Sequence, residues 1–313
     1  MQKFLDYILE RKSITFDSAK ANYGQCIILA GGAGSGKSFI QNKILCDFSV
    51  VDVDKFKETY LKMVEKGIIK DDTKYDLANP EDVSKLHGKV KQHGWKNSQR
   101  QGFWNGRQVI DAVKNGKPTN LPNIIWDMVC GEVSDIENVV KMAKPMGYTV
   151  TIIWVVCNKD TAKIANQIRD RHVSDSIIEQ THTGAYEVMD GLYSGKYPEL
   201  EAMIDKMWLG FSAGFGRKLV NQYEESPVYK IKSSKSPKLL YDKPLVDKFL
   251  SEPCPLDYKF LDKALNSDNP KKVKQTEKFI DLVGVTKEEI AEKAKEANES
   301  FDEVMEKYKL LLS

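Results

Sequence analysis

Short apolar runs alternate with amphipathic stretches along most of the chain. Five runs are rich in β-branched and aromatic residues, as strands are, and they cover residues 25–30, 49–52, 123–127, 148–156 and 228–232. Stretches with helical spacing separate these runs, which is typical of parallel strands joined by crossover helices. The pattern predicts an α/β fold in which helices cover both faces of a mostly parallel sheet. The unbroken apolar stretch 152–156 fits a central strand.

The segment 55–118 is too long for a simple crossover between two strands. It contains helical spacing at 55–66, 80–93 and 104–114, with turn residues between these stretches. We interpret the segment as a helical insertion over one edge of the site.

The composition changes after about residue 241, where prolines 244, 253, 255 and 270 punctuate the chain. A capping box at Thr286–Glu289 begins a last helix. Its apolar positions are Ile290, Ala294, Ala297, Phe301, Val304, Tyr308 and Leu311. This stripe either docks on the protein's own surface or contacts a protein partner or a second copy. We expect a larger domain over 1–241, with its insertion at about 55–118, and a C-terminal helical appendage over 242–313.

The composition indicates a globular protein of the cytoplasm. The chain has 313 residues, 41% of them hydrophobic, and a net charge of +2, so no global charge favours nucleic acid or a membrane surface. Its five cysteines are scattered and odd in number, which predicts reduced and mostly buried thiols. The four histidines show no metal-binding spacing. We find no apolar run of membrane-spanning length and no signal-peptide pattern.

A glycine-rich segment follows the first apolar run and precedes a helical stretch. Its spacing matches the Walker A loop, in which backbone N–H groups surround phosphate oxygens, the lysine reaches the β- and γ-phosphates and the serine hydroxyl ligates Mg²⁺. The predicted contacts to ATP are Gly31, Gly32, Ala33, Gly34, Ser35, Gly36, Lys37, Ser38 and Phe39. The segment therefore predicts binding of ATP with Mg²⁺.

Two acids end the second predicted strand. In an open α/β sheet ligands bind beyond the carboxyl ends of the strands, so Asp54 is well placed to accept a proton from an attacking hydroxyl. Asp52 is expected nearer to Mg²⁺ or to Ser38. The alternative is that both acids cap the helix that follows.

A third acid, Asp127, ends the third predicted strand in a segment that resembles Walker B. Met128 follows it where motor ATPases usually place a glutamate that activates water, which argues against a motor. Asp127 is therefore expected to hold Mg²⁺ or its water shell, to contact the acceptor, or to have a structural role.

Two arginines, Arg169 and Arg171, are predicted on the helix after the fourth strand. Kinases with this loop often carry lid arginines there, whose planar forks neutralise charge on the transferred phosphoryl group. The alternative is a solvated helix face paired with Asp170 or Asp175. The stretch Thr181–Gly184 is either a lid turn at the phosphates or an ordinary loop.

Together, the loop at 31–38, the run Asp52–Lys57, the strand ending at Asp127 and the turn at 147–148 resemble the zeta-toxin family of P-loop kinases over residues 22–241. The resemblance implies a P-loop kinase fold that phosphorylates a hydroxyl, in the known toxins the 3′-hydroxyl of UDP-N-acetylglucosamine. It also implies the residue roles: ATP–Mg²⁺ on Lys37 and Ser38, general base Asp54, acceptor-site acid Asp127, and lid arginines Arg169 and Arg171.

The acceptor side departs from the family pattern. The family has a glutamate followed by a Gly-Thr-Gly-Arg-like run, whereas Asp127 is followed by Met-Val-Cys-Gly131, which lacks a hydroxyl and an arginine.

The sequence thus favours an ATP-dependent kinase that acts on a hydroxyl of a small or nucleotide-containing acceptor, with UDP-sugars among the candidates. The insertion is where an acceptor could be selected. One alternative is a polynucleotide 5′-hydroxyl kinase, because the aromatic and basic stretch 93–107 could stack a base. Another is a nucleotide-binding interaction protein without catalysis.

Overall fold

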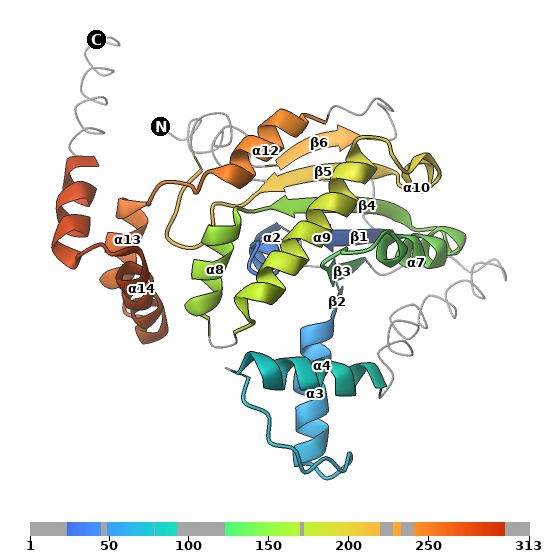
Figure 1. The fold of residues 1–313 in the computed structure, drawn as a ribbon, viewed down its shortest axis with the longest axis horizontal. Helices are drawn as coiled ribbons and strands as arrows, with labels where there is room; N and C mark the ends of the chain where they lie inside the picture. The colour runs from blue at the N-terminus through green and yellow to red at the C-terminus, as the bar shows by residue number, and fades with distance from the viewer. Residues whose placement is uncertain are drawn as a thin grey trace.

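A six-stranded sheet forms the centre of the molecule. The computed structural model describes residues 24–44, 49–77, 79–92, 123–169, 172–219, 228–232 and 241–297. The strands lie in the order β2-β3-β1-β4-β5-β6 (Figure 1). They are β1 (Gln25–Ala30), β2 (Ser49–Asp52), β3 (Ile124–Met128), β4 (Thr149–Val156), β5 (Lys206–Phe211) and β6 (Val228–Lys232). The first five run parallel and β6 is antiparallel to β5, which confirms the predicted α/β fold with a mostly parallel sheet.

The strand β5 was not among the predicted strands. Its sequence Lys-Met-Trp-Leu-Gly-Phe contains Gly210, and glycine is unfavourable inside a strand, so the apolar run is short and interrupted. Pairing with β4 on one side and β6 on the other overrides this weak local signal.

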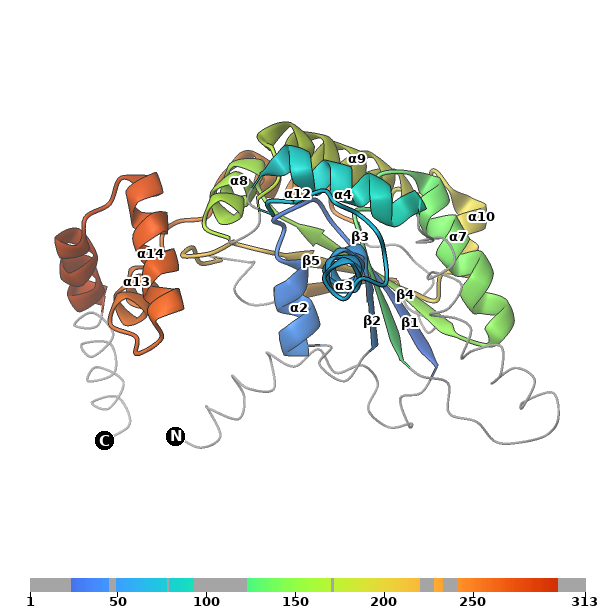
Figure 2. The ribbon, with the colours of Figure 1, turned by 90° about the horizontal axis from the view of Figure 1, so that it is seen from below.

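Alternate residues of β1 face two different layers of helices. Ile27 and Leu29 pack against Ile40 of α2 (Lys37–Ile44) on one face. Cys26, Ile28 and Ala30 face the other side, which is covered by α7 (Val133–Ala143), α9 (Asp175–Tyr193) and α12 (Lys243–Ser251). Figure 2 shows α2 below the strands and α7, α9 and α12 above them. Helices on both faces were predicted, and this is confirmed.

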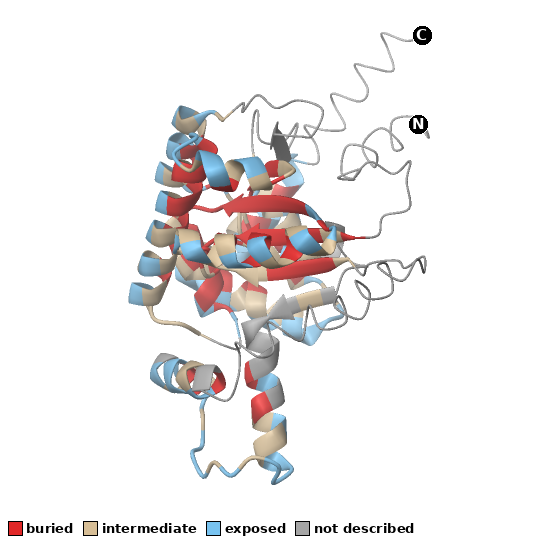
Figure 3. Ribbon diagram, turned by 90° about the vertical axis from the view of Figure 1, so that its right-hand side faces the viewer, coloured by how far each residue is buried: buried red, intermediate tan, exposed pale blue. Residues whose placement is uncertain are grey.

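Two helices form a small cluster of their own beyond β2. They are α3 (Val53–Glu65) and α4 (Pro80–Gln92), and they pack through Tyr60, Leu86 and Val90. These are two of the predicted helices of the insertion; the third, at 104–114, lies outside the described residues, as does the stretch 93–107. Figure 3 shows the pair projecting from the sheet, where most of the buried residues are.

Smaller elements complete the larger body: η1 (Lys144–Met146), α8 (Lys159–Gln167) and α10 (Pro198–Met203). The chain then continues through α12 into α13 (Tyr258–Leu265), α14 (Pro270–Val283) and a helix over 287–297. We call α13, α14 and the helix 287–297 the C-terminal unit.

The C-terminal unit has its own apolar cluster, which includes Leu261, Phe279 and Ile290. The last helix begins with the N-cap bond of the predicted capping box, in which the Glu289 N–H donates to Thr286 Oγ1 at 3.1 Å. Ile290 and Ala294 of the apolar stripe are buried, whereas positions 301–311 lie outside the described residues. The predicted division at 241/242 stays a prediction, and α12 packs in the core of the larger body through Val246 and Phe249.

The four cysteines in the described part are free and buried, as predicted. Burial raises the pKa of Cys26 and of Cys157 to about 12. Across the described residues, no helix combines the length and the apolar character needed to span a membrane.

Candidate nucleotide-binding site

The glycine-rich loop leaves β1 at the carboxyl edge of the sheet and ends where α2 begins at Lys37. Gly34 and Gly36 have φ angles of +79° and +91°, which glycine adopts without steric cost. A Cβ on Gly34 would lie 2.7 Å from the Ala162 carbonyl oxygen of α8. A Cβ on Gly36 would lie 2.5 Å from Ser212 Oγ, just after β5. The loop is therefore tightly packed between α8 and the segment that follows β5.

The Lys37 side chain crosses the loop. Its Nζ donates hydrogen bonds to the carbonyl oxygens of Gly31 at 2.7 Å and Gly32 at 3.1 Å, and it lies 3.7 Å from Asp127 Oδ1. The side chains of Lys37 and Asp127 are each 13% exposed, so their charges interact more strongly than at the surface. The structure thus brings two predicted site residues, from α2 and β3, to one point at the edge of the sheet.

Helix α9 contacts the loop from the side opposite α2 and forms two hydrogen bonds with it. His182 Nε2 donates to the Ala33 carbonyl oxygen at 2.8 Å, because a carbonyl can only accept, and the Ala33 N–H donates to Thr181 Oγ1 at 3.1 Å. A Cβ on Gly32 would lie 2.2 Å from His182 Cδ2. Burial lowers the pKa of His182, which favours the neutral imidazole.

This arrangement corrects the prediction for Thr181–Gly184, which was a lid turn or a loop. The segment lies inside α9, whose N-cap Ser174 precedes it by about two turns of helix. Gly184 is accommodated in the helix beside the Gly131 backbone, since a Cβ added to Gly184 would lie 3.3 Å from Gly131 Cα. A glycine that is typical of a turn therefore serves close packing instead.

The acids of the second strand lie at the same edge. Asp52 is the last residue of β2 and is the register partner of Asp127 in β3. Asp54 lies in the first turn of α3. The side chains of Asp52 and Asp54 are outside the described part of the structure, so their roles as metal ligand and general base stay predictions.

Arg169 lies after the helix on which it was predicted. Helix α8 ends at Gln167, with Ile168 as its C-cap, so Arg169 is in the connection to α9 and is exposed. The turn is fixed because Asn166 bonds both the N–H and the carbonyl of Val173, at 3.0 and 2.8 Å. Arg171 lies outside the described residues.

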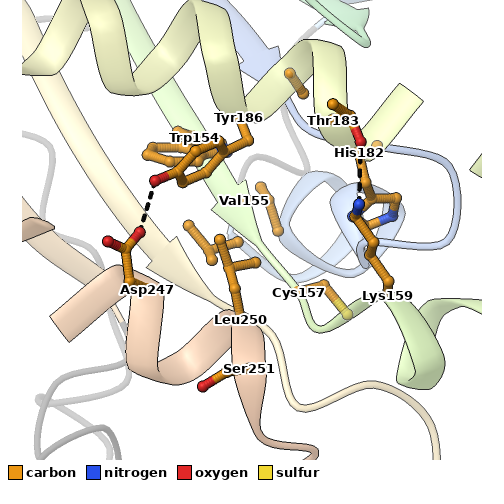
Figure 4. Close-up of a pocket in the computed structure, with 13 residues that line it drawn as sticks. Trp154, Val155, Cys157, Lys159, His182, Thr183, Tyr186, Asp247, Leu250 and Ser251 are labelled. Atoms are coloured by element: carbon orange, nitrogen blue, oxygen red, sulfur yellow. Dashed lines mark hydrogen bonds between the residues drawn. The ribbon is translucent and has the colours of Figure 1, made fainter. Parts of the chain in front are cut away.

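A cavity of about 340 Å³ adjoins the loop at Gly32. It lies between the end of β4, α9 and α12; Figure 4 shows Trp154 and Tyr186 on one side and His182 and Lys159 on the other. Tyr186 Oη donates to an Asp247 carboxylate oxygen at 2.6 Å. Two strands lie between β4 and β2, so the cavity is about 14 Å along the sheet from the strand that leads to Asp54.

Sequence reasoning missed Ser212 and the part that His182 plays in holding the loop. Neither belongs to a motif, and the bond from His182 to Ala33 joins residues 149 positions apart in the chain. The cavity was missed for the same reason, because its walls come from separate segments of the chain.

The residues present suit ATP with Mg²⁺. The loop offers close backbone approach at its glycines, an ammonium group at Lys37 and an exposed hydroxyl at Ser38. Mg²⁺ prefers oxygen ligands and usually keeps only one or two protein carboxylates, the rest being water and phosphate oxygens. The described side chains contain no group of three or more His, Cys, Asp or Glu that could hold a metal by itself.

No protein-family model matches the chain, and no curated protein matches it. Several solved structures match the chain. One from the PezAT chromosomal toxin-antitoxin system of Streptococcus pneumoniae is 13% identical, with 90% of this chain and 96% of that chain covered and a TM-score of 0.41. The AvrRxo1-ORF1:-ORF2 complex with ATP is 14% identical, with 90% and 83% covered and a TM-score of 0.47.

The Pnkp1/Rnl/Hen1 RNA repair complex is 15% identical, with 56% of this chain and 48% of that chain covered and a TM-score of 0.33. All three structures have identities of 13–15% and TM-scores below 0.5. At these identities they are similar in fold alone.

Proposed function

We propose that this chain is an ATP-dependent kinase that transfers the γ-phosphate to a hydroxyl of a small or nucleotide-containing acceptor, UDP-sugars included. One observation carries the proposal. Lys37 Nζ lies between the carbonyl oxygens at the start of the phosphate loop and Asp127 of the neighbouring strand. A cation in this position sits where phosphate and acceptor would meet.

The donor half of the reaction uses the loop and α2. Backbone N–H groups of the loop and the N-terminus of α2 bind the phosphates, and Lys37 exchanges its loop carbonyls for phosphate oxygens. The contacts from Thr181 and His182 fix the loop in advance, so that little reorganisation is needed when charge develops.

The acceptor half uses the edge formed by β2 and β3. Asp54 accepts the proton of the attacking hydroxyl, and Asp127 orients the acceptor. Arg169, with Arg171, reaches from the connection after α8 to neutralise charge on the transferred group. Mg²⁺ would be held by Ser38, Asp52 and Asp127 and would supply positive charge to the phosphates.

The test is transfer of labelled γ-phosphate to a panel of nucleotide sugars, nucleosides and oligonucleotides with a 5′-hydroxyl. We expect transfer to at least one member. Asp54→Asn should lower it by a factor of about 10²–10⁴, the usual contribution of a general base, and should spare ATP binding. The matched control is Asp72→Asn, an exposed acid of the same insertion, which should act like the parent.

The panel separates the competing functions. Transfer to the oligonucleotide alone would identify a polynucleotide kinase. ATP binding without transfer to any member would contradict catalysis and favour the nucleotide-binding interaction protein. Full activity of Asp54→Asn would contradict its role as the base.

A cytoplasmic location and a protein partner for the C-terminal helix belong to the same proposal. The first is supported by the free thiols of the described part. The second is supported by the apolar stripe that continues to Leu311.

A further inference from the structure

The C-terminal unit packs on two of the chain segments that support the phosphate loop. One is α8, and the other is the segment 212–219 after β5. Because each of these segments also touches the loop, the unit is connected to the nucleotide site through them.

The segment after β5 joins the loop to the unit. At one end, Ser212 Oγ lies against Gly36. At the other, Gly216 lies against the ring of Phe279: a Cβ on Gly216 would be 2.5 Å from Phe279 Cε1, and its φ of +68° also favours glycine. The Asp257 N–H donates to the Gly216 carbonyl oxygen at 2.9 Å, just before α13.

Further bonds fasten the same segment to the chain that leads into α13. Arg217 Nη1 donates to the Cys254 carbonyl oxygen at 2.5 Å, and the Lys218 N–H donates to the Pro255 carbonyl oxygen at 3.0 Å. The segment 212–219 is thus held by hydrogen bonds at the end away from the loop.

Helix α8 makes the second connection. Ala162 lies against Gly34 of the loop. Ile164 of the same helix and its C-cap Ile168 lie in the apolar cluster of the C-terminal unit with Phe279. Ile168 directly precedes Arg169, so packing of the unit also fixes where that arginine leaves the helix.

Phe279 is where the two connections meet. It is 1% exposed, its ring is 5.5 Å from the ring of Phe215 at an interplanar angle of 70°, and it shares a cluster with Ile168. If the unit were unrelated to the nucleotide site, this close contact between Phe279 and Gly216 would not be needed. Figure 1 shows α14 beside α8, on the far side from α2.

We propose that the C-terminal unit stabilises the nucleotide site by packing against α8 and the segment 212–219. Phe279 then acts as a positioning residue for the phosphate loop and for Arg169. The proposal rests on the proposed function, since it assumes that the loop binds ATP. The unit then belongs functionally to the kinase site, although it follows the larger body in the chain.

The test compares Phe279→Ala with Leu200→Ala. Leu200 is 3% exposed in α10, before β5, at the edge of the sheet opposite to the loop, so its truncation also leaves a cavity. Binding of a fluorescent ATP analogue is measured at a temperature where circular dichroism shows both variants folded. We expect Phe279→Ala to raise the Kd about three- to thirtyfold, the range of energetic coupling through packed networks. Leu200→Ala should stay within about twofold of the parent.

Two more variants keep the test decisive. If Phe279→Ala does not fold, Phe279→Leu keeps an apolar side chain and should raise the Kd by a smaller factor. Leu282→Ala, at an exposed position of the same helix, should change nothing. Equal Kd values for the Phe279 variants, Leu200→Ala and the parent would contradict the proposal that the C-terminal unit stabilises the site. Absence of ATP binding by the parent protein would instead overturn the proposed function.

Discussion

The contact between His182 and the phosphate loop allows a quantitative prediction. His182→Leu removes the donor that bonds the Ala33 carbonyl oxygen at 2.8 Å but keeps apolar volume beside Gly32. Leaving a buried carbonyl without its donor costs about 1–3 kcal/mol, which is an upper bound for this partly buried bond. If all of this cost falls on the ATP-binding conformation of the loop, the Kd for ATP rises by about 5- to 150-fold.

The assay is binding of a fluorescent ATP analogue, with thermal unfolding measured in parallel. His182→Gln is the matched variant, because its side-chain amide can donate from nearly the same place. We expect it to bind ATP within about threefold of the parent, since the bond is kept. Any cost that appears in folding instead should lower the Tm by about 2–4 °C for each kcal/mol.

The same residue predicts a pH dependence. Burial lowers the pKa of His182 below its ordinary value of 6.5, so the unfolded chain takes up a proton at that position more readily than the folded protein. Its contribution therefore destabilises the fold as the pH falls below about 6.5 and is absent above that value. The difference in Tm between pH 7.5 and pH 5.5 should be smaller in His182→Gln than in the parent.

Unchanged ATP affinity and unchanged Tm in His182→Leu would refute this reasoning. That result would mean that the Ala33 carbonyl finds water or another donor at no cost. It would also mean that the bond from His182 does not help to hold the loop.

Two further predictions concern the loop and the buried thiols. Gly34→Ala places a Cβ 2.7 Å from the Ala162 carbonyl oxygen at a φ of +79°. It should therefore weaken binding of the fluorescent ATP analogue at least tenfold. Gly67→Ala, at a φ of +68° in open space, should leave binding unchanged. Cys26 and Cys157, with pKa values raised to about 12 by burial, should resist iodoacetamide at pH 8 until the protein is unfolded; peptide mass spectrometry that finds either labelled in the folded protein would contradict their burial.

The features that could be predicted from the sequence are those encoded in neighbouring residues. The phosphate loop is one, because glycines, lysine and serine at fixed spacing between a strand and a helix determine its conformation locally. The capping box at Thr286 is another. The four strands besides β1 that were predicted also have runs of β-branched or aromatic residues.

The features that were missed depend on distant residues. β5 becomes a strand through pairing on both sides, despite Gly210. The end of α8 is decided by the packing of Ile168 and the bonds of Asn166 rather than by a proline or glycine, so Arg169 follows the helix on which it was predicted. The hydrogen bond from His182 to the Ala33 carbonyl oxygen has no sequence motif that would predict it.

The position of β1 in the sheet has a consequence for how the protein is made. β1 is synthesised before β3 and β4 but lies between them, and the Gln25 N–H donates to Asn123 Oδ1 across 98 positions of the chain. A nascent chain therefore holds the phosphate-loop residues without both neighbouring strands until the ribosome has passed β4. Closing so long a connection costs conformational entropy, and pairing between strands far apart in the chain is slow. The segment with the most obvious motif therefore gains both neighbouring strands only after β4 has been made, and a translation product truncated before β4 would carry the motif without the site.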